Sequence, residues 1–175
     1  MIEQREACKI IKKHFEGKDV VGAEVGVCYG DHAESLLYNI PNLHLHLIDD
    51  ASEYETKVYG ALGRELKNIP NNRYTWHLNS SIGAAKDFGD NSLDFVYIDA
   101  KHDAGSVLQD CGVWYPKIKK GGIICGHDYD TTMGSEVPQA VDEFFKRFDK
   151  TVHSGANNDD SIAFLKNISD WWVYA

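Results

Sequence analysis

Short apolar runs alternate along the chain with segments in which apolar residues recur every three or four positions. The runs are typical of buried strands, and the periodic segments are typical of amphipathic helices. The first periodic segment contains Cys8, Ile11 and Phe15 at helical spacing. It predicts a helix at the N-terminus, within residues 1–17.

The rest of the pattern predicts strands and helices in alternation. Strands are expected at 20–27, 43–50, 73–78, 93–100 and 119–129, followed by a final pair at 151–155 and 161–167. Helices are expected at 31–40, 52–66, 81–88 and 104–118, and again from Pro138 onward. This order favours right-handed βαβ units and a mostly parallel sheet. We therefore predict a single α/β domain over residues 1–175.

Local signals refine two of these helices. Asp31 and Glu34 have the spacing of a capping box, which predicts the start of the helix at 31–40. Pro138 suits the first turn of the last helix. The apolar stripe expected to bury that helix consists of Val141, Phe144, Phe145 and Phe148.

Polar or small residues follow the predicted parallel strands at their carboxyl ends, although the strand bodies are apolar. These residues are Glu24 to Gly26, Asp49 and Asp50, Ser80 and Ser81, Asp99, and His127 and Asp128. Ligands of parallel α/β sheets bind outside the carboxyl ends of the strands. A purely structural sheet has no need of this pattern, so it predicts a ligand site.

The composition limits the partners of such a site. The formal net charge of -9 is spread along the chain, and an acidic surface repels phosphate backbones, so we expect no nucleic-acid partner. The four cysteines form no C-x-x-C pair, which fits a reducing cytoplasm better than a zinc site or a disulfide framework. No segment is apolar enough to span a bilayer, and residues 1–17 lack an apolar signal core. We therefore expect a cytoplasmic protein without a membrane partner.

The first predicted strand ends in a glycine loop that begins with an acid. Its spacing is Glu24-x-Gly26-x-x-x-Gly30, which differs from the G-x-G-x-x-G fingerprint of dinucleotide sites. A carboxylate at this place would repel a pyrophosphate but could face a cation. Asp49 ends the next strand, where an acid typically accepts hydrogen bonds from ribose hydroxyls. The two acids predict a ligand with a ribose, a positive charge and no phosphate.

Three stretches around these strand ends, "EVGVCYG", "LIDD" and "FVYIDAKHDAGSV…WYPKIKKGGIICGHDY", resemble the class I S-adenosylmethionine-dependent methyltransferases. The likeness is greatest to the macrocin-type and catechol-type O-methyltransferases of small molecules, and it covers nearly the whole chain. It implies a Rossmann-like, seven-stranded, mostly parallel sheet with helices on both faces and an antiparallel last strand. It also implies S-adenosylmethionine as the cofactor.

The resemblance assigns cofactor contacts by position. The cofactor-binding residues that it implies are Glu24, Gly26, Gly30, Asp49, Ser80, Ser81 and Asp99. The first three would contact the methionine part, Asp49 would hold the ribose, and the two serines would lie near the adenine. Many relatives have an acid where Ser80 stands. Solvated loop acids are the alternative interpretation of Glu24 and Asp49.

A second polar cluster is expected from the fourth and fifth strands. Asp99 ends one, and His127 and Asp128 end the other. Two carboxylates beside an imidazole suit a divalent ion such as magnesium or manganese. In the metal-dependent O-methyltransferases that the chain resembles, three ligands come from these positions, with Asp and Asn or two Asp where His127 and Asp128 stand here. The alternative is a polar cluster that only shapes the substrate pocket.

His102 lies three residues past Asp99, in the loop after the fourth strand. The resemblance to the catechol-type enzymes implies a general base at this position. We therefore predict His102 and Asp99 as the catalytic residues. A histidine with a pKa near neutrality can serve as such a base. The alternative is a surface loop histidine.

We therefore predict transfer of a methyl group from S-adenosylmethionine to an oxygen of a small hydroxylated acceptor, such as a sugar or metabolite, with optional help from a divalent ion such as Mg²⁺. The alternatives are a metal-dependent hydrolase built on Asp99, His127 and Asp128, and a cofactor-binding protein without catalysis. Little sequence is left for a substrate cap. The acceptor pocket is then either shallow or completed by another subunit of a homo-oligomer.

Overall fold

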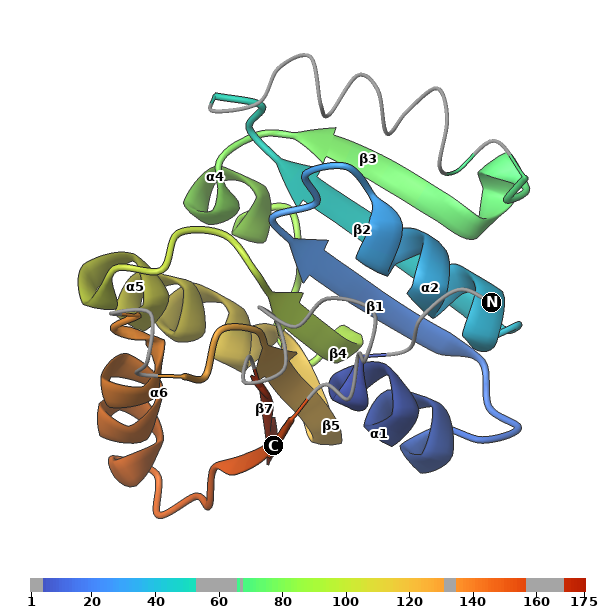
Figure 1. Ribbon diagram of the computed structural model, residues 1–175. Helices are drawn as coiled ribbons and strands as arrows, with labels where there is room; N and C mark the ends of the chain where they lie inside the picture. The colour runs from blue at the N-terminus through green and yellow to red at the C-terminus, as the bar shows by residue number, and fades with distance from the viewer. Residues whose placement is uncertain (1–4, 53–65, 67, 131–134, 157–168) are drawn as a thin grey trace.

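The computed structural model describes residues 5–52, 66, 68–130, 135–156 and 169–175. Within them, seven strands form one sheet in the order β3-β2-β1-β4-β5-β7-β6 (Figure 1). The strands are β1 (Val20–Val25), β2 (Leu43–Asp49), β3 (Tyr74–Leu78), β4 (Leu93–Ile98), β5 (Ile118–Gly126), β6 (His153–Ala156) and β7 (Ser169–Tyr174). Neighbours from β3 to β5 pair parallel, whereas β7 pairs antiparallel with β5 and β6. The predicted Rossmann-like sheet with an antiparallel last strand is confirmed.

Helices cover both faces of this sheet. One face carries α1 (Glu6–His14) and α2 (Asp31–Asn39), and the other carries α4 (Ser81–Ala85), α5 (Ala104–Trp114) and α6 (Val137–Lys146) (Figure 1). Single 3-10 turns lie at Asn71–Arg73 and Tyr115–Lys117. None of the helices in the described ranges is long and apolar enough to cross a membrane.

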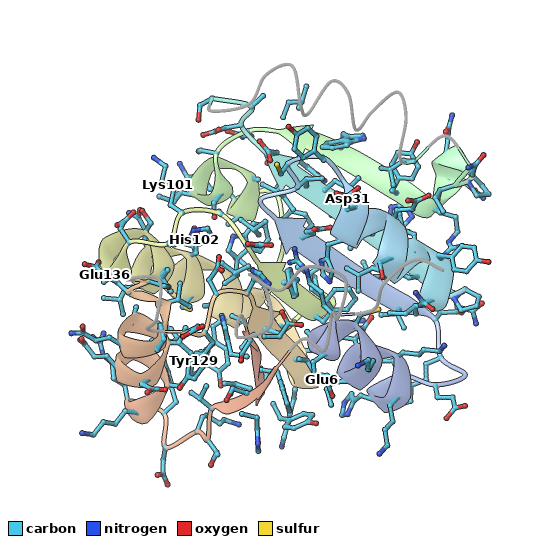
Figure 2. The ribbon with its side chains drawn as sticks, in the orientation of Figure 1. Glu6, Asp31, Lys101, His102, Tyr129 and Glu136 are labelled. Atoms are coloured by element: carbon cyan, nitrogen blue, oxygen red, sulfur yellow. The ribbon has the colours of Figure 1, made fainter. Side chains whose placement is uncertain are left out.

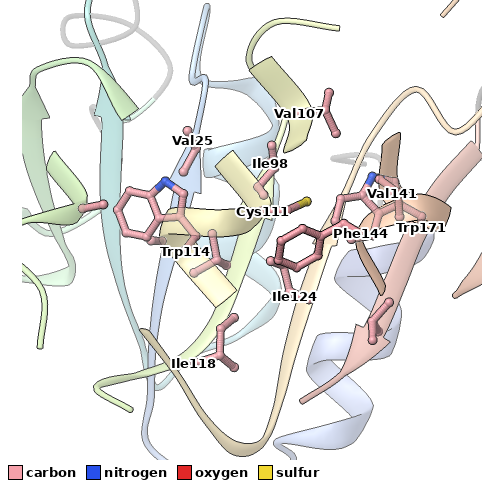
Figure 3. Close-up of a cluster of buried hydrophobic side chains, with 14 of the residues drawn as sticks. Val25, Ile98, Val107, Cys111, Trp114, Ile118, Ile124, Val141, Phe144 and Trp171 are labelled. Carbon is pink, nitrogen blue, oxygen red and sulfur yellow. The ribbon is translucent and has the colours of Figure 1, made fainter. Parts of the chain in front are cut away.

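The sheet has a core on each side because side chains alternate along a strand. In β4, Phe95 and Tyr97 join the core under α1 and α2, while the residues between and after them join the core under α4, α5 and α6. Trp114 of α5, Phe144 of α6 and Trp171 of β7 all belong to this second core (Figure 3). These two cores hold the strand ends in fixed positions for the site described below.

Two details of the helices differ from the sequence prediction. Helix α2 begins with Gly30 as its N-cap, at a φ of 87°, and has no side-chain cap hydrogen bond. The capping box is therefore wrong, although the charge of Asp31 in the first turn still favours the helix dipole. Three of the four residues predicted to bury α6 are buried in that helix, namely Val141, Phe144 and Phe145. The fourth, Phe148, lies beyond the end of the helix and is 49% exposed.

The last strand also differs from the prediction. The predicted helix at 52–66 and the predicted strand at 161–167 lie outside the described residues, apart from Ser52 and Leu66. Strand β7 instead covers Ser169–Tyr174, a segment in which the sequence analysis expected no strand. Asp170 interrupts its apolar pattern while being fully buried, so the segment has no clear alternation.

Candidate active site

The sheet register brings the predicted strand ends to one edge. Val25 of β1 pairs with Ile48 of β2 and with Ile98 of β4. The residues that follow these three are Gly26, Asp49 and Asp99. Strand β5 pairs with the other side of β4, so its end adds His127 and Asp128. The predicted site residues of four strands therefore meet at the carboxyl edge of the sheet.

The glycine loop lies directly against the end of β4. Gly26 has a φ of +89°, and a Cβ atom there would lie 2.1 Å from the backbone oxygen of Asp99. Glycine is needed for both reasons, because an L side chain disfavours this backbone and has no room. The same loop contains Cys28 at a φ of 50° and ends at Gly30.

Asp49 holds the glycine loop in place. Its Oδ2 accepts hydrogen bonds from the backbone N–H groups of Val27 at 2.9 Å and Cys28 at 3.1 Å, and its Oδ1 accepts one from Ala51 at 2.8 Å. A carboxylate offers about four lone-pair positions, so Asp49 keeps capacity for a ligand hydroxyl. The sequence analysis gave this residue only the ligand-binding role.

Glu24 forms a buried pair with His32 of α2. Nδ1 of His32 lies 3.3 Å from Oε1 of Glu24, and the side chains are only 4% and 1% exposed. Burial raises the pKa of Glu24 well above its ordinary value and lowers the pKa of His32 well below, which favours neutral forms of both. Oε2 of Glu24 and Nε2 of His32 have no hydrogen-bond partner within the part of the chain that the structure describes.

The ends of β4 and β5 form an acid–histidine cluster of Asp99, His102, His127 and Asp128. Nε2 of His102 lies 2.8 Å from Oδ2 of Asp128 and 3.6 Å from Oδ1 of Asp99. Nδ1 of His127 lies 3.3 Å from Oδ1 of Asp128 and 3.9 Å from Oδ1 of Asp99. Asp99, His102 and Asp128 can each offer one ligand atom within 4.8 Å of the others. The structure therefore brings all four side chains together.

Opposite charges stabilise one another in this cluster. Hydrogen bonds to Asp128 and Asp99 raise the pKa of His102 to about 10. Burial would raise the pKa of both acids, but neighbouring groups outweigh it and hold both pKa values well below their usual range. For Asp99 these are the positive charge of Arg5 and the hydrogen bond from His102. For Asp128 they are the hydrogen bonds from His102 and His127.

Arg5 is a site residue that the sequence analysis missed. Its Nη1 donates hydrogen bonds to Oδ2 of Asp99 at 2.6 Å and to the hydroxyl of Tyr97 at 2.7 Å. The Tyr97 hydroxyl donates to Oδ1 of Asp170 at 3.0 Å, and Oδ2 of Asp170 accepts from the backbone N–H of Ala7 at 2.8 Å. This network ties the start of α1 to β4, β7 and the acid–histidine cluster. No local pattern marks it, because its members lie far apart in sequence.

Two cavities meet at this edge of the sheet. The smaller, of about 260 Å³, extends from Gly26 and Asp49 to α4 and α5. The larger, of about 750 Å³, contains the acid–histidine cluster and Arg5. Both are lined by Gly26, Cys28, Asp99, Ala100 and Lys101. A ligand in the smaller cavity can therefore present one end to the cluster, and Figure 2 shows Lys101 and His102 in the loop before α5.

The backbone at this edge is also unusual. Among the described residues, five that are not glycine have a positive φ, and three of these are Cys28, Ala51 and Asp128. They follow β1, β2 and β5 respectively. Such conformations cost about 1–3 kcal/mol each and tend to cluster at ligand sites. The unusual backbone conformations and the polar side chains therefore both indicate a ligand site at this edge of the sheet.

Comparison with known families agrees with this geometry. The sequence model of a family described as a methyltransferase domain matches residues 23–129, which is more than half of the chain. This chain belongs to that methyltransferase family. The matched region contains the glycine loop and the acid–histidine cluster of the methyltransferase. A search of curated proteins found no match.

Solved structures share the fold. The precorrin-6y C5,15-methyltransferase of Geobacter metallireducens aligns with a TM-score of 0.70 and 13% identity, over 97% of this chain and 89% of that one. The O-methyltransferase of Bacillus cereus, solved with S-adenosylhomocysteine, gives 0.69 and 12% over 96% and 78%. The O-methyltransferase TomG of Streptomyces achromogenes, solved with S-adenosylmethionine, gives 0.70 and 12% over 96% and 77%. The fold is that of the class I methyltransferases.

The far end of the methyltransferase's smaller cavity contains the two predicted serines. Oγ of Ser80 caps α4 by accepting a hydrogen bond from the N–H of Gly83 at 3.2 Å. Oγ of Ser81 donates to Oδ1 of Asp110 at 2.5 Å and accepts from Nε1 of Trp114 at 2.9 Å. Asp110 is a second residue that the sequence analysis missed, since a single acid in a helix gives no signal of its own.

Proposed function

We propose that this methyltransferase transfers a methyl group from S-adenosylmethionine to an oxygen atom of a small hydroxylated molecule. The observation that carries the proposal is the acid–histidine cluster at the junction of the two cavities. The smaller cavity, with its glycine-lined wall, would receive the cofactor. The larger one would receive the acceptor and expose its hydroxyl to two carboxylates and two imidazoles.

The residues of the smaller cavity fit this cofactor. Gly26 lines both cavities without a side chain, so a ligand can approach the backbone there closely. Glu24 lines the larger cavity only, next to Gly26. Asp49 has remaining capacity for a ribose hydroxyl. Asp99 stands where the two cavities meet. The loop lacks the glycine spacing of a pyrophosphate site, which argues against NAD.

The chemistry requires alignment and removal of one proton. S-adenosylmethionine supplies the methyl group: the acceptor oxygen bonds to the methyl carbon as the carbon–sulfur bond breaks, which leaves S-adenosylhomocysteine. The neutral imidazole of His102 takes the hydroxyl proton at Nδ1, because its Nε2 is the nitrogen that faces Asp128 and Asp99. These two carboxylates hold the ring in position through Nε2 and stabilise the imidazolium that forms.

The acid–histidine cluster also fits a divalent cation. Asp99, His102 and Asp128 would hold it, with His127 beside them. This donor set suits manganese as well as magnesium. When bound, the ion would lower the pKa of the acceptor hydroxyl and fix its position. The sequence predicts His127 as the imidazole ligand, whereas His102 is the imidazole of the group within 4.8 Å.

The decisive experiment is a transfer assay with methyl-labelled S-adenosylmethionine and a panel of sugars and hydroxylated metabolites, with and without Mg²⁺. We expect a labelled ether product and an equal amount of S-adenosylhomocysteine for at least one acceptor. Binding of S-adenosylhomocysteine without transfer to any acceptor would instead favour a cofactor-binding protein without catalysis. Metal-dependent hydrolysis without such binding would favour the hydrolase.

Asp49→Ala is expected to weaken S-adenosylhomocysteine binding by about 1.5–3 kcal/mol, as for hydrogen bonds to a charged group. The change removes the ribose acceptor, the two hydrogen bonds that hold the glycine loop, and the local hydrogen bond from Ala51. Calorimetry would measure the effect. Asp90→Ala is the control, because it removes an exposed carboxylate that lines neither cavity. Tighter binding of NAD than of S-adenosylhomocysteine to the wild-type protein would contradict the cofactor assignment.

Asp128→Ala is expected to abolish the response of turnover to Mg²⁺ or Mn²⁺ and to leave the affinity for S-adenosylhomocysteine nearly unchanged. Asp128 lines the larger cavity only, so the cofactor contacts stay intact. Turnover would be measured after chelation and during titration with each metal. Asp90→Ala removes a surface acid and serves as the control. Full turnover of a chelated wild-type protein would show that no metal takes part.

A further inference from the structure

We infer that Glu136 is a positioning residue for the acid–histidine cluster, because it fixes the loop that carries His102; the inference rests on the proposed function. Glu136 is the N-cap of α6 and lies beyond the region that matches the methyltransferase family. It lines neither of the two cavities at the carboxyl edge of the sheet. Its effect on the reaction is therefore exerted through residues that do line them.

Glu136 is tied to the loop between β4 and α5 by two hydrogen bonds. Its Oε2 accepts one from the backbone N–H of Ala104 at 2.8 Å. Its own backbone N–H donates to the carbonyl oxygen of His102 at 3.3 Å. Figure 2 shows Glu136 and His102 on these adjacent segments. The backbone that carries the His102 side chain is therefore held from the start of α6.

The carboxylate of Glu136 suits its place at the start of α5. Ala104 is the first residue of that helix, where the backbone N–H groups have no partner inside the helix. Asp103 caps the helix by accepting the N–H of Ser106, and Glu136 accepts the N–H of Ala104. The positive end of the helix dipole favours a carboxylate there. Geometry and charge therefore hold Glu136 against the loop.

The neighbouring Ser135 holds the partner of His102 on the other strand. Its Oγ donates a hydrogen bond to the backbone oxygen of Asp128 at 3.0 Å. Asp128 has a φ of 56°, a conformation that persists in a residue other than glycine only when its surroundings hold it. Ser135 and Glu136 therefore link the loop after β5 to the loop after β4.

This link supports the short contact across the acid–histidine cluster. Nε2 of His102 lies 2.8 Å from Oδ2 of Asp128. The last register pair of β4 and β5 joins Ile98 to Gly126, so both residues of the contact lie beyond the sheet. The sheet alone does not fix their backbones, and the hydrogen bonds of Ser135 and Glu136 supply the missing constraint. Misplacement of a reacting group by about 1 Å can cost about 10²-fold in rate.

The first test observes the ring of His102 directly, without any reaction. Nitrogen NMR of the ¹⁵N-histidine-labelled protein in a chelator would be recorded, and His102→Ala would identify the signals of that ring. We expect Glu136→Ala to shift these signals and to leave those of His44 and His46 on β2 unchanged. Glu136→Gln should keep them in place, because its amide oxygen can still accept the N–H of Ala104. Unchanged His102 signals in Glu136→Ala would overturn the inference.

The second test measures turnover with the acceptor that the transfer assay identifies. Glu136→Ala is expected to lower kcat about 10- to 100-fold. The affinity for S-adenosylhomocysteine and the Tm should stay nearly unchanged, because Glu136 is exposed and lines neither cavity. Glu136→Gln should restore most of the kcat, which a loss of charge alone would not allow. Glu143→Ala, which removes another exposed acid of α6, is the matched control and should behave as the wild type.

A double mutant shows whether Glu136 acts through His102. If it does, Glu136→Ala should lower kcat much less in the His102→Ala background than in the wild type. Equal losses in the two backgrounds, or a wild-type kcat in Glu136→Ala, would overturn this inference alone. Absence of transfer by the wild-type protein to any acceptor would overturn the proposed function with it.

Discussion

Gly26→Ala is expected to abolish measurable S-adenosylhomocysteine binding and to lower the free energy of unfolding. The new Cβ atom would lie 2.1 Å from the backbone oxygen of Asp99, and neither backbone can move freely. The N–H of Gly26 is bonded to the oxygen of Ile48, and the N–H of Asp99 is bonded to the oxygen of Val25. Such overpacking costs about 1–3 kcal/mol, in addition to the strain of a positive φ.

Two matched variants separate these causes. Gly17 also has a positive φ, of +74°, but among the described residues no atom lies within 4 Å of the place that a Cβ would take, so Gly17→Ala isolates the backbone strain. Gly89 has neither a positive φ nor an atom within 4 Å of the place that a Cβ would take. Gly89→Ala should therefore leave both cofactor binding and stability nearly unchanged. Calorimetry for binding and chemical denaturation for stability would rank the three. A Gly26→Ala protein that binds as the wild type does would show that the loop does not approach Asp99 in solution.

The part of the site that follows from local pattern could be predicted from the sequence. Apolar strands that end in a polar residue mark the carboxyl edge, and parallel strands bring these ends together without any knowledge of side-chain packing. The placement of Gly26, Asp49, Asp99 and Asp128 at this edge was predicted in this way. The sheet itself was equally predictable, because alternating strands and helices leave few topologies.

The rest depends on contacts between distant parts of the chain. Arg5 meets Asp99 across 94 residues, and Asp110 meets Ser81 across 29. Nothing in the sequence near either residue indicates such a partner. Strand β7 escaped prediction for a related reason, since Asp170 is buried only because Tyr97 and the N–H of Ala7 bind its two oxygens.

His102→Ala is expected to lower turnover by about 10²–10⁴-fold, the usual contribution of a general base. The affinity for S-adenosylhomocysteine should stay nearly unchanged, because His102 lines only the larger cavity. Turnover has to be measured where chemistry limits the rate. Lys101→Ala changes the adjacent residue, which lines both cavities, and provides the comparison. A large loss in Lys101→Ala with wild-type turnover in His102→Ala would transfer the role of proton acceptor to Lys101.

The pH profile distinguishes the two roles of His102. Because Asp128 and Asp99 raise its pKa to about 10, the imidazole without a bound cation is mostly protonated at pH 7. Its neutral fraction then rises about tenfold per pH unit, so turnover of a base should increase from pH 7 towards 10. Asp128→Asn removes the main cause of the raised pKa and should move this increase to lower pH in the presence of a chelator. If His102 acts as a metal ligand instead, its loss should abolish the response to Mn²⁺, and the chelated protein should show no such profile.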